Sequence, residues 1–307
     1  MTIYDQIAKN KRKSVLLIVL FIIIIIAIGW VFSEFSEVGY AGLVMAVIIA
    51  IAMSLFGYYS GDKVALWTAG AKPITKEQNA YVYRMVENLC ITAGLPLPKV
   101  HIINNSAINA FATGRDPQHA SIAVTTGAIE KLENEELEGV IAHELSHVKN
   151  YDIRIMMLVI ICVGIVALLS NWFFRISFYG GFGGRRSSSR SSSGGRIQLI
   201  MMVVGIALLI FAPIFAQLIK FAISRKREFL ADASGVLLTR YPDGLANALE
   251  KIKNQNIEPM PRANNATAHL YISNPFGAKA KKGLAKLFST HPPIEERIAA
   301  LRGQTNN

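Results

Sequence analysis

Long apolar segments constrain this chain more than any other feature of its sequence. Two of them, residues 15–32 and 38–56, approach the roughly 20 residues that a helix needs to cross the hydrocarbon core of a bilayer. Two more follow at about 155–174 and 197–218. The 307 residues are 52% hydrophobic and carry a formal net charge of +11. This pattern predicts a membrane protein with four transmembrane helices rather than a soluble domain with a large core.

The first apolar segment resembles a secretory signal peptide in one respect, because the basic stretch KNKRK precedes it. A signal peptide has a shorter apolar region followed by a small-residue cleavage site, and this segment has neither feature. We therefore expect it to be a membrane anchor. The two cysteines, Cys90 and Cys162, cannot form a disulfide framework, and this usage fits a soluble part kept in a reducing compartment.

Basic residues beside the apolar segments predict the orientation of the chain in the cell membrane. They precede the first segment and follow the second and the fourth: Lys9, Lys11, Arg12, Lys13, Lys63, Lys72, Lys76, Arg225, Lys226 and Arg227. The loop between the first two segments holds Glu34 and Glu37 and no basic residue. The parts outside the membrane are therefore predicted to face the cytoplasm. The loop 174–196, rich in arginine, glycine and serine, conflicts with this orientation and is expected to be a flexible tether.

The apolar segments divide the chain into an N-terminal transmembrane hairpin (1–57), the first half of a cytoplasmic domain (58–152), a second hairpin (153–223) and the second half of the domain (224–307). An amphipathic helix is predicted to end at Gly94, and KVHII and SIAVTT are typical of short strands. The stretch INAFATG between them can also extend. A second helix is predicted over NEELEGVIAHELSHVKN, with Asn134 as its N-cap. The expected fold is an α+β membrane protein whose mainly helical domain contains a small β-sheet.

The second predicted helix carries His143, Glu144 and His147 in the pattern H-E-x-x-H. Residues four apart share one face of a helix, so both imidazoles can bind one metal ion. Glu144 is offset by about 100° of helical turn, where a base can act on metal-activated water. The same pattern also occurs by chance on surface helices, so it requires support from the rest of the chain.

A catalytic zinc needs a third protein ligand and an open fourth position. Asp152 is near in sequence, but on the same helix it would be poorly placed to close a tetrahedron. The next carboxylate beyond the apolar segments is Glu228, and Asp232 follows one turn later. Asp232 is suited to hold a ligand histidine through its second ring nitrogen. The alternative is that these acids begin an ordinary solvated helix beside Arg225 and Arg227.

Four stretches together resemble the HtpX-type membrane zinc endopeptidases, which are bacterial relatives of the prenyl-protein CAAX endoproteases. They are NAFATG (109–114), AHELSHVKNYD (142–152), REFLADASGV (227–236) and THPPIEERIAAL (290–301). The resemblance covers almost the whole chain. It implies a gluzincin-type domain with one Zn²⁺ per chain, held by His143, His147 and Glu228, and with Glu144 as the base. It also implies quality control, in which misfolded membrane proteins are cut at the cytoplasmic face.

Five further residues are candidate contacts to the substrate or to the oxyanion: Asn109, Ala110, Phe111, Ala112 and His291. The first four lie in a stretch that resembles the edge strand of the family, and an edge strand can bind an extended peptide through main-chain hydrogen bonds. An internal strand is the alternative interpretation. His291 precedes two prolines, so it either stabilises an oxyanion or only caps the final helix.

Other functions were weighed against a zinc endopeptidase. A CAAX-type prenyl-protein protease would share the same motifs, and a non-catalytic metal-binding scaffold would have no need for Glu144. Two histidines and one carboxylate also suit non-haem iron. A transporter is disfavoured because the first two segments contain no intramembrane acid or base. The expected partners are membrane-protein substrates and the lipid bilayer, and nucleic acid is disfavoured because the basic residues flank apolar segments.

Overall fold

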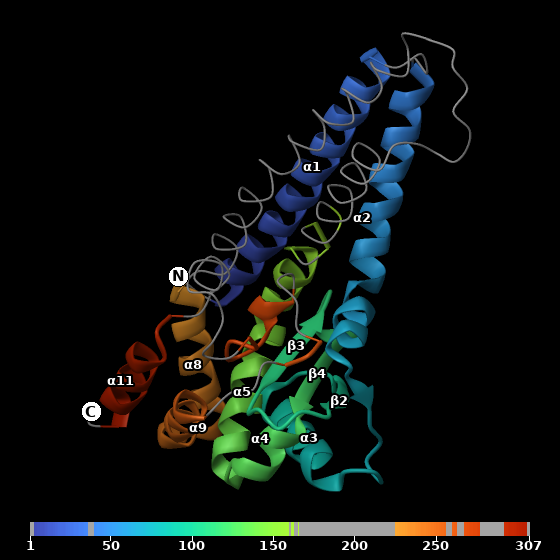
Figure 1. Ribbon diagram of the computed structural model, residues 1–307. Coiled ribbons are helices and arrows are strands. Elements are labelled where there is room, and N and C mark those ends of the chain that lie inside the picture. The colour runs from blue at the N-terminus through green and yellow to red at the C-terminus, as the bar shows by residue number, and fades with distance from the viewer. Residues whose placement is uncertain are drawn as a thin grey trace.

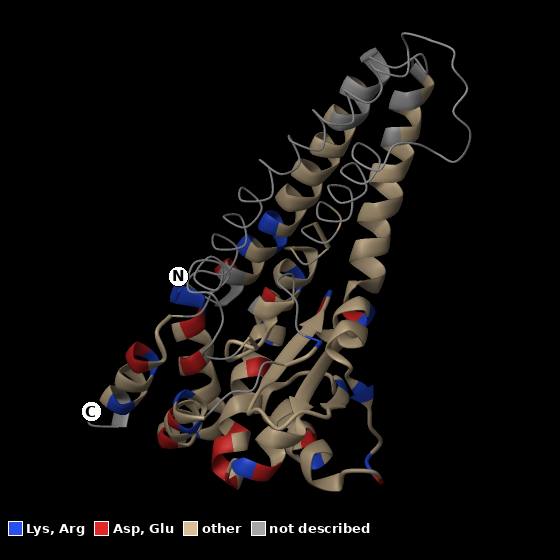
Figure 2. Cartoon of the chain, viewed as in Figure 1, with Lys and Arg blue, Asp and Glu red and all other residues tan. Residues whose placement is uncertain are grey.

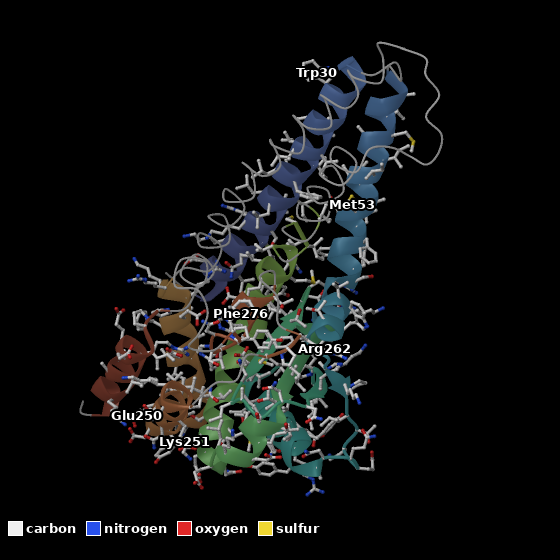
Figure 3. The ribbon with its side chains drawn as sticks, viewed as in Figure 1. Trp30, Met53, Glu250, Lys251, Arg262 and Phe276 are labelled. Atoms are coloured by element: carbon white, nitrogen blue, oxygen red, sulfur yellow. The ribbon has the colours of Figure 1, made fainter. Side chains whose placement is uncertain are left out.

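The computed structural model describes residues 3–35, 40–159, 161–162, 165, 225–255, 260–262, 267–276 and 292–305. Two long helices, α1 (Ile3–Phe35) and α2 (Tyr40–Ala69), lie side by side and extend away from a compact part that contains the sheet (Figure 1). Charged residues are concentrated in the compact part and in the adjoining end of α1 (Figure 2). Trp30 and Met53 lie on the hairpin, whereas Glu250 and Arg262 lie on the compact part (Figure 3). The chain thus combines an apolar hairpin with a mixed α and β domain.

The hairpin holds the first two apolar segments of the sequence. In the part of the chain that the structure describes, one stretch, Val47–Ala69, is long and apolar enough to cross a membrane by length and composition. α2 does not end near the predicted boundary at residue 57 but continues to Ala69, and its last turns are buried in the domain at Ala65 and Ala69. Most of the third and fourth predicted segments lie outside the described residues, so the count of four spans stays a prediction.

Among the residues that the structure describes, the sheet has four strands in the order β1-β2-β4-β3. They are β1 (Lys72–Pro73), β2 (Lys99–Ile103), β3 (Ala110–Gly114) and β4 (Ala120–Thr125). β2 and β4 are parallel, and the other two pairs are antiparallel. The strands predicted from KVHII and SIAVTT are confirmed, and INAFATG supplies β3. β3 is an edge strand, as its resemblance to the edge strand of the family predicts.

Alternate residues of the sheet enter two separate cores. Ile122 and Val124 of β4 pack into a core with α5, whereas Ala123 and Phe111 pack into another with the end of α2. This alternation follows from the two-residue period of a strand. Because both faces are covered, all residues of β3 and β4 are buried although β3 lies at an edge.

The helices before the metal motif are capped by local side chains. α3 (Ala80–Ala93) begins after Asn79, whose side chain accepts a hydrogen bond from the Val82 N–H, and ends at Gly94 in the left-handed conformation, as predicted. α4 (Thr126–Lys131) is short. α5 (Asn134–Lys149) carries the metal motif, but its N-cap is Glu133 and not Asn134. The prediction was wrong by one residue, because the Glu136 side chain accepts a hydrogen bond from the Glu133 N–H and fixes the earlier start.

The second half of the domain packs directly on α5. It contributes α8 (Arg225–Thr239), α9 (Pro242–Asn254), α11 (Ile294–Thr305) and a short 3₁₀ turn at Ala268–Leu270. A further 3₁₀ turn, Pro117–His119, lies between β3 and β4 in the first half. The buried residues Glu228, Asp232 and Gly235 recur at helical spacing on the face of α8 that meets α5. A Cβ atom on Gly235 would lie 3.1 Å from the backbone nitrogen of His143, so the backbones of the two helices are in close contact beside the metal motif.

Candidate metal centre

Three side chains from two helices converge on one point inside the domain. The Nε2 atoms of His143 and His147 lie 3.2 Å apart, and their rings are nearly perpendicular. Glu228 places one carboxylate oxygen 3.8 Å from Nε2 of His143 and the other 3.7 Å from Nε2 of His147. All three side chains are buried. Within the described residues, these three form the one group of donor atoms that could hold a metal ion.

The spacing of these atoms fits a tetrahedral metal site. Two nitrogens bound at 2.0–2.1 Å to one zinc ion would lie about 3.3 Å apart, close to the observed separation of the imidazoles. The glutamate oxygens lie a few tenths of an ångström further from the nitrogens than this geometry requires, a difference that a small side-chain rotation can close. The donors present therefore fit a zinc ion.

Each imidazole is oriented by a carboxylate on its outer nitrogen. Asp232 lies 2.9 Å from Nδ1 of His143, and Asp152 lies 3.1 Å from Nδ1 of His147. A hydrogen bond at Nδ1 leaves the lone pair of Nε2 directed at the metal position and makes the ring a better ligand. Asp232 thus occupies the position that its spacing from Glu228 predicted.

Contrary to the expectation from the sequence, Asp152 does not lie on the same helix as the metal motif. α5 ends at Lys149 with Asn150 as its C-cap, Tyr151 has a left-handed backbone with φ 60°, and residues 152–159 form a new helical segment. This break turns the Asp152 side chain back onto His147. A left-handed non-glycine residue carries backbone strain of order 1 kcal/mol, which the surrounding contacts must hold. Asp152 contacts the outer nitrogen of the imidazole, whereas the candidate third donor on the metal side is Glu228.

Two arginines that the sequence analysis did not assign to the site hold these carboxylates. Arg297 of α11 is fully buried and donates to both oxygens of Asp232, at 2.9 Å from Nε and 2.6 Å from Nη2. Arg227 of α8 donates to Asp152 at 2.7 Å. Arg227 is adjacent to Glu228 in a stretch already singled out, so its position was a usable signal. Arg297 also lies in a stretch already singled out, THPPIEERIAAL, but nothing in the spacing of that stretch connects it with Asp232.

The electrostatics of the site favour a divalent cation. Four buried carboxylates (Glu144, Asp152, Glu228 and Asp232) face two guanidinium groups, which leaves an excess of two negative charges. Burial alone would lower the pKa of His147, but the carboxylates of Asp152, Glu228 and Glu144 outweigh it and raise that pKa to about 9. For the carboxyl of Asp232, burial acts in the opposite direction and would raise the pKa, but Arg297 and His143 lower that pKa to about 2. Metal binding must therefore displace a proton from His147, while Asp232 stays ionised.

Glu144 joins the metal motif to the edge strand. Its side chain is buried, and Oε2 accepts a hydrogen bond of 2.9 Å from the Ala112 N–H of β3. The carbonyl of Asn109 accepts from Thr125 of β4, so the main-chain groups of Phe111 and Thr113 also face β4. Those of Ala110, Ala112 and Gly114 face away from the sheet. Ala112 therefore directs its N–H toward Glu144 and the metal position.

The remaining candidate contacts are placed differently. The Asn109 side chain donates 3.1 Å to the Ser273 carbonyl and accepts from the Ser273 N–H, and the Ile272 N–H donates to the Ala110 carbonyl. Residues 267–276 thus cover that end of β3. Phe111 packs edge-on against Tyr271, with ring centroids 5.1 Å apart, on the face away from α5. His291 lies outside the described residues.

A buried H-E-x-x-H helix with a glutamate from a second helix is the site of the metallopeptidase class. The chain belongs to peptidase family M48, which its residues 76–305 match. It is 45% identical over 304 residues to a "Protease HtpX homolog" of Caldanaerobacter subterraneus subsp. tengcongensis, covering 99% of this chain and 98% of that protein. A "Protease HtpX homolog" of Thermoanaerobacter pseudethanolicus is 43% identical, with the same coverage of both chains. The resemblance to HtpX-type proteases is confirmed, and the protein is a metalloprotease.

One solved structure extends the comparison to the fold. The crystal structure of S. mikatae Ste24p covers 97% of this chain and 67% of its own length, with a TM-score of 0.50 and 20% sequence identity. At this identity the likeness concerns the fold alone. It agrees with a mainly helical domain that contains a small sheet.

Single substitutions distinguish the role of the metal donor Glu228 from the role of the carboxylates that bind the outer nitrogens of the histidines. We expect Glu228→Ala to lose zinc, because two imidazoles alone do not complete the donor set. Asp232→Ala should weaken zinc affinity by the roughly 10- to 100-fold typical of losses at the outer nitrogen of a ligand histidine. Zinc content and competition with a chelator measure both effects in purified protein. Loss of the metal in Asp152→Ala with full retention in Glu228→Ala would contradict the assignment.

Proposed function

We propose that this protein is a membrane-integrated zinc endopeptidase that cuts misfolded or damaged membrane proteins at the cytoplasmic face. The observation that carries the proposal is the buried convergence of His143, His147 and Glu228 beside Glu144. In this proposal the first three hold zinc and Glu144 is the general base. Zinc is favoured over iron because a glutamate next to the first histidine serves hydrolysis and has no evident use in oxygen chemistry.

A zinc ion bound by this donor set supplies Lewis-acid chemistry and lowers the pKa of coordinated water to about 7. The carboxylate of Glu144 accepts the proton of the attacking water and passes it to the leaving amine. The Ala112 N–H, 2.9 Å from this carboxylate, orients it before the substrate arrives. Asp232 and Asp152 keep the Nδ1 protons on the two imidazoles throughout the reaction.

Replacement of the base tests this mechanism. Glu144→Gln should retain one zinc per chain and lose peptide-bond hydrolysis, because the amide cannot accept the proton from water. Zinc content and cleavage of casein or of a membrane-protein substrate are measured on the same preparation. Glu135→Gln, an exposed change on the same helix, is the matched control and should cleave normally. Near-normal turnover in Glu144→Gln would end the proposed mechanism.

The substrate is proposed to bind as an added strand along β3. A protease that accepts varied sequences needs recognition that ignores side chains, and main-chain pairing with an edge strand supplies it. Residues 267–276 cover the edge at Ala110, so the outward groups of Ala112 and Gly114 are assigned to the substrate. The Ala112 N–H, which donates to Glu144 in the substrate-free protein, would pair with the substrate once it binds. This stretch leads directly to Glu144 and the metal donors, which would bring the scissile bond to the site.

The register of β3 makes a proline test specific. Ala112→Pro removes an N–H that points away from the sheet, so it should abolish cleavage while zinc content and membrane insertion stay intact. Phe111→Pro removes an N–H that faces β4 and should instead disturb the sheet. Ala112→Ser keeps the N–H and is the control that should cleave. Normal cleavage by Ala112→Pro in a folded, zinc-loaded protein would exclude main-chain pairing at this position.

The proposed cytoplasmic orientation is supported by the basic residues around the apolar segments. We expect cysteines introduced at Lys76 and Lys253 to be protected from an impermeant thiol reagent in intact cells, and a cysteine at Glu34 to react. The native thiols Cys90 and Cys162 are buried and give a low background. Lys76 and Lys253 belong to the two halves of the domain that share the site. Opposite accessibility of these two positions would break the one-site proposal.

A further inference from the structure

A buried polar cluster joins the first helix of the hairpin to the metal centre. Asn10 of α1 is 3% exposed. Its amide nitrogen donates 2.7 Å to a carboxylate oxygen of Asp152 and 2.7 Å to the Asn150 carbonyl, and its amide oxygen accepts from Arg227 at 3.1 Å. Both ends of the amide are thus used by residues that lie far from α1 in the sequence.

The two oxygens of Asp152 have separate partners. Oδ1 accepts from Asn10 and from Arg227, each at 2.7 Å, whereas Oδ2 contacts Nδ1 of His147 at 3.1 Å. A carboxylate held at one oxygen by two donors has a fixed plane, and its other oxygen then has a fixed direction. The orientation of the His147 imidazole therefore depends on groups from α1 and α8.

α1 is long enough to connect the bilayer with this carboxylate, so a shift of the helix can change the position of Asp152. Its 33 residues span about 50 Å, which exceeds the roughly 30 Å of a hydrocarbon core. The apolar run begins at Val15, just beyond Asn10, and the end before it reaches the compact part of the molecule (Figure 1). Lys11 adds a second contact there, with its ammonium 4.7 Å from the ring centre of Tyr151, the left-handed residue before Asp152.

We propose that α1 is a working part of the metal centre, and that Asn10 is a positioning residue that acts on His147 through Asp152. Zinc affinity then depends on the docking of the cytoplasmic end of α1 and, through it, on the seating of the hairpin in the bilayer. This inference rests on the proposed zinc site. Asn10 contacts neither the donor atoms nor the substrate strand, so its effect is confined to orientation.

The test measures zinc binding by the full chain in detergent or nanodiscs. Asn10→Leu has nearly the same shape as asparagine and lacks its hydrogen bonds. We expect it to release zinc to a chromogenic chelator about 10 to 100 times faster than the natural sequence, the size of effect known for outer partners of ligand histidines. Saturating zinc should restore most of its activity. Ser14→Ala removes a buried hydrogen bond within α1, at 2.9 Å to the Asn10 carbonyl, and should bind zinc normally.

A double-substitution cycle separates positioning from general destabilisation. Asp152→Asn should show a loss similar to that of Asn10→Leu, and the double variant should be no worse than Asp152→Asn alone, because both changes break one pathway. Additive losses, or unchanged zinc release in Asn10→Leu, would overturn the inference. If Asn10→Leu fails to insert into the membrane, Asn10→Ser replaces it, because a serine side chain is too short to reach Asp152. The same zinc-release rates and the same double-substitution cycle are then measured. A natural chain that binds no zinc would instead refute the proposed function.

Discussion

The packing of α8 directly against α5 is the contact on which the rest of the site depends. Gly235 permits backbone approach at His143, and two turns earlier on the same face Glu228 reaches both imidazoles. A larger residue at this contact would separate the helices by more than the few tenths of an ångström that a metal site tolerates. The donor atoms sit on two regular helices and not on loops, so their spacing follows from helix geometry. The edge strand and the outer carboxylates are arranged around this pair.

Two of the buried carboxylates at the site are stabilised by donors of opposite charge. Asp232 is held by Arg297 from α11, and Asp152 by Arg227 from α8 and by Asn10 from α1. Removing one member of a buried ion pair commonly costs about 3–5 kcal/mol, because the partner is left as an uncompensated charge. The carboxylates around His147 also raise the pKa of its imidazole, so they favour a positive charge at this position. The stability of the domain and its ability to hold a metal thus share one set of contacts.

Local patterns in the sequence predicted the elements that carry the chemistry, and long-range contacts were beyond them. Runs of β-branched residues and the helical spacing of apolar residues predicted β2, β4 and α5, and the i to i+4 spacing paired Glu228 with Asp232. The break at Tyr151 was missed because neither glycine nor proline marks it. Arg297 meets Asp232 across 65 positions and Asn10 meets Asp152 across 142, and no periodicity connects residues so far apart. The sequence therefore shows the reactive residues and Asp232, which orients one of them, but not the orienting residues that come from distant parts of the chain.

The distribution of the site along the chain also sets the order in which it can be assembled. α1 and α5 are synthesised first, and they contain Asn10, both histidines and the glutamate between them. The carboxylate that completes the donor set arrives only with α8, after the long intervening stretch has left the ribosome. Between the synthesis of His147 and that of Glu228, a nascent chain therefore carries an unfinished donor set. The complete site, and with it hydrolysis, becomes possible only once α8 has been made and has packed against α5.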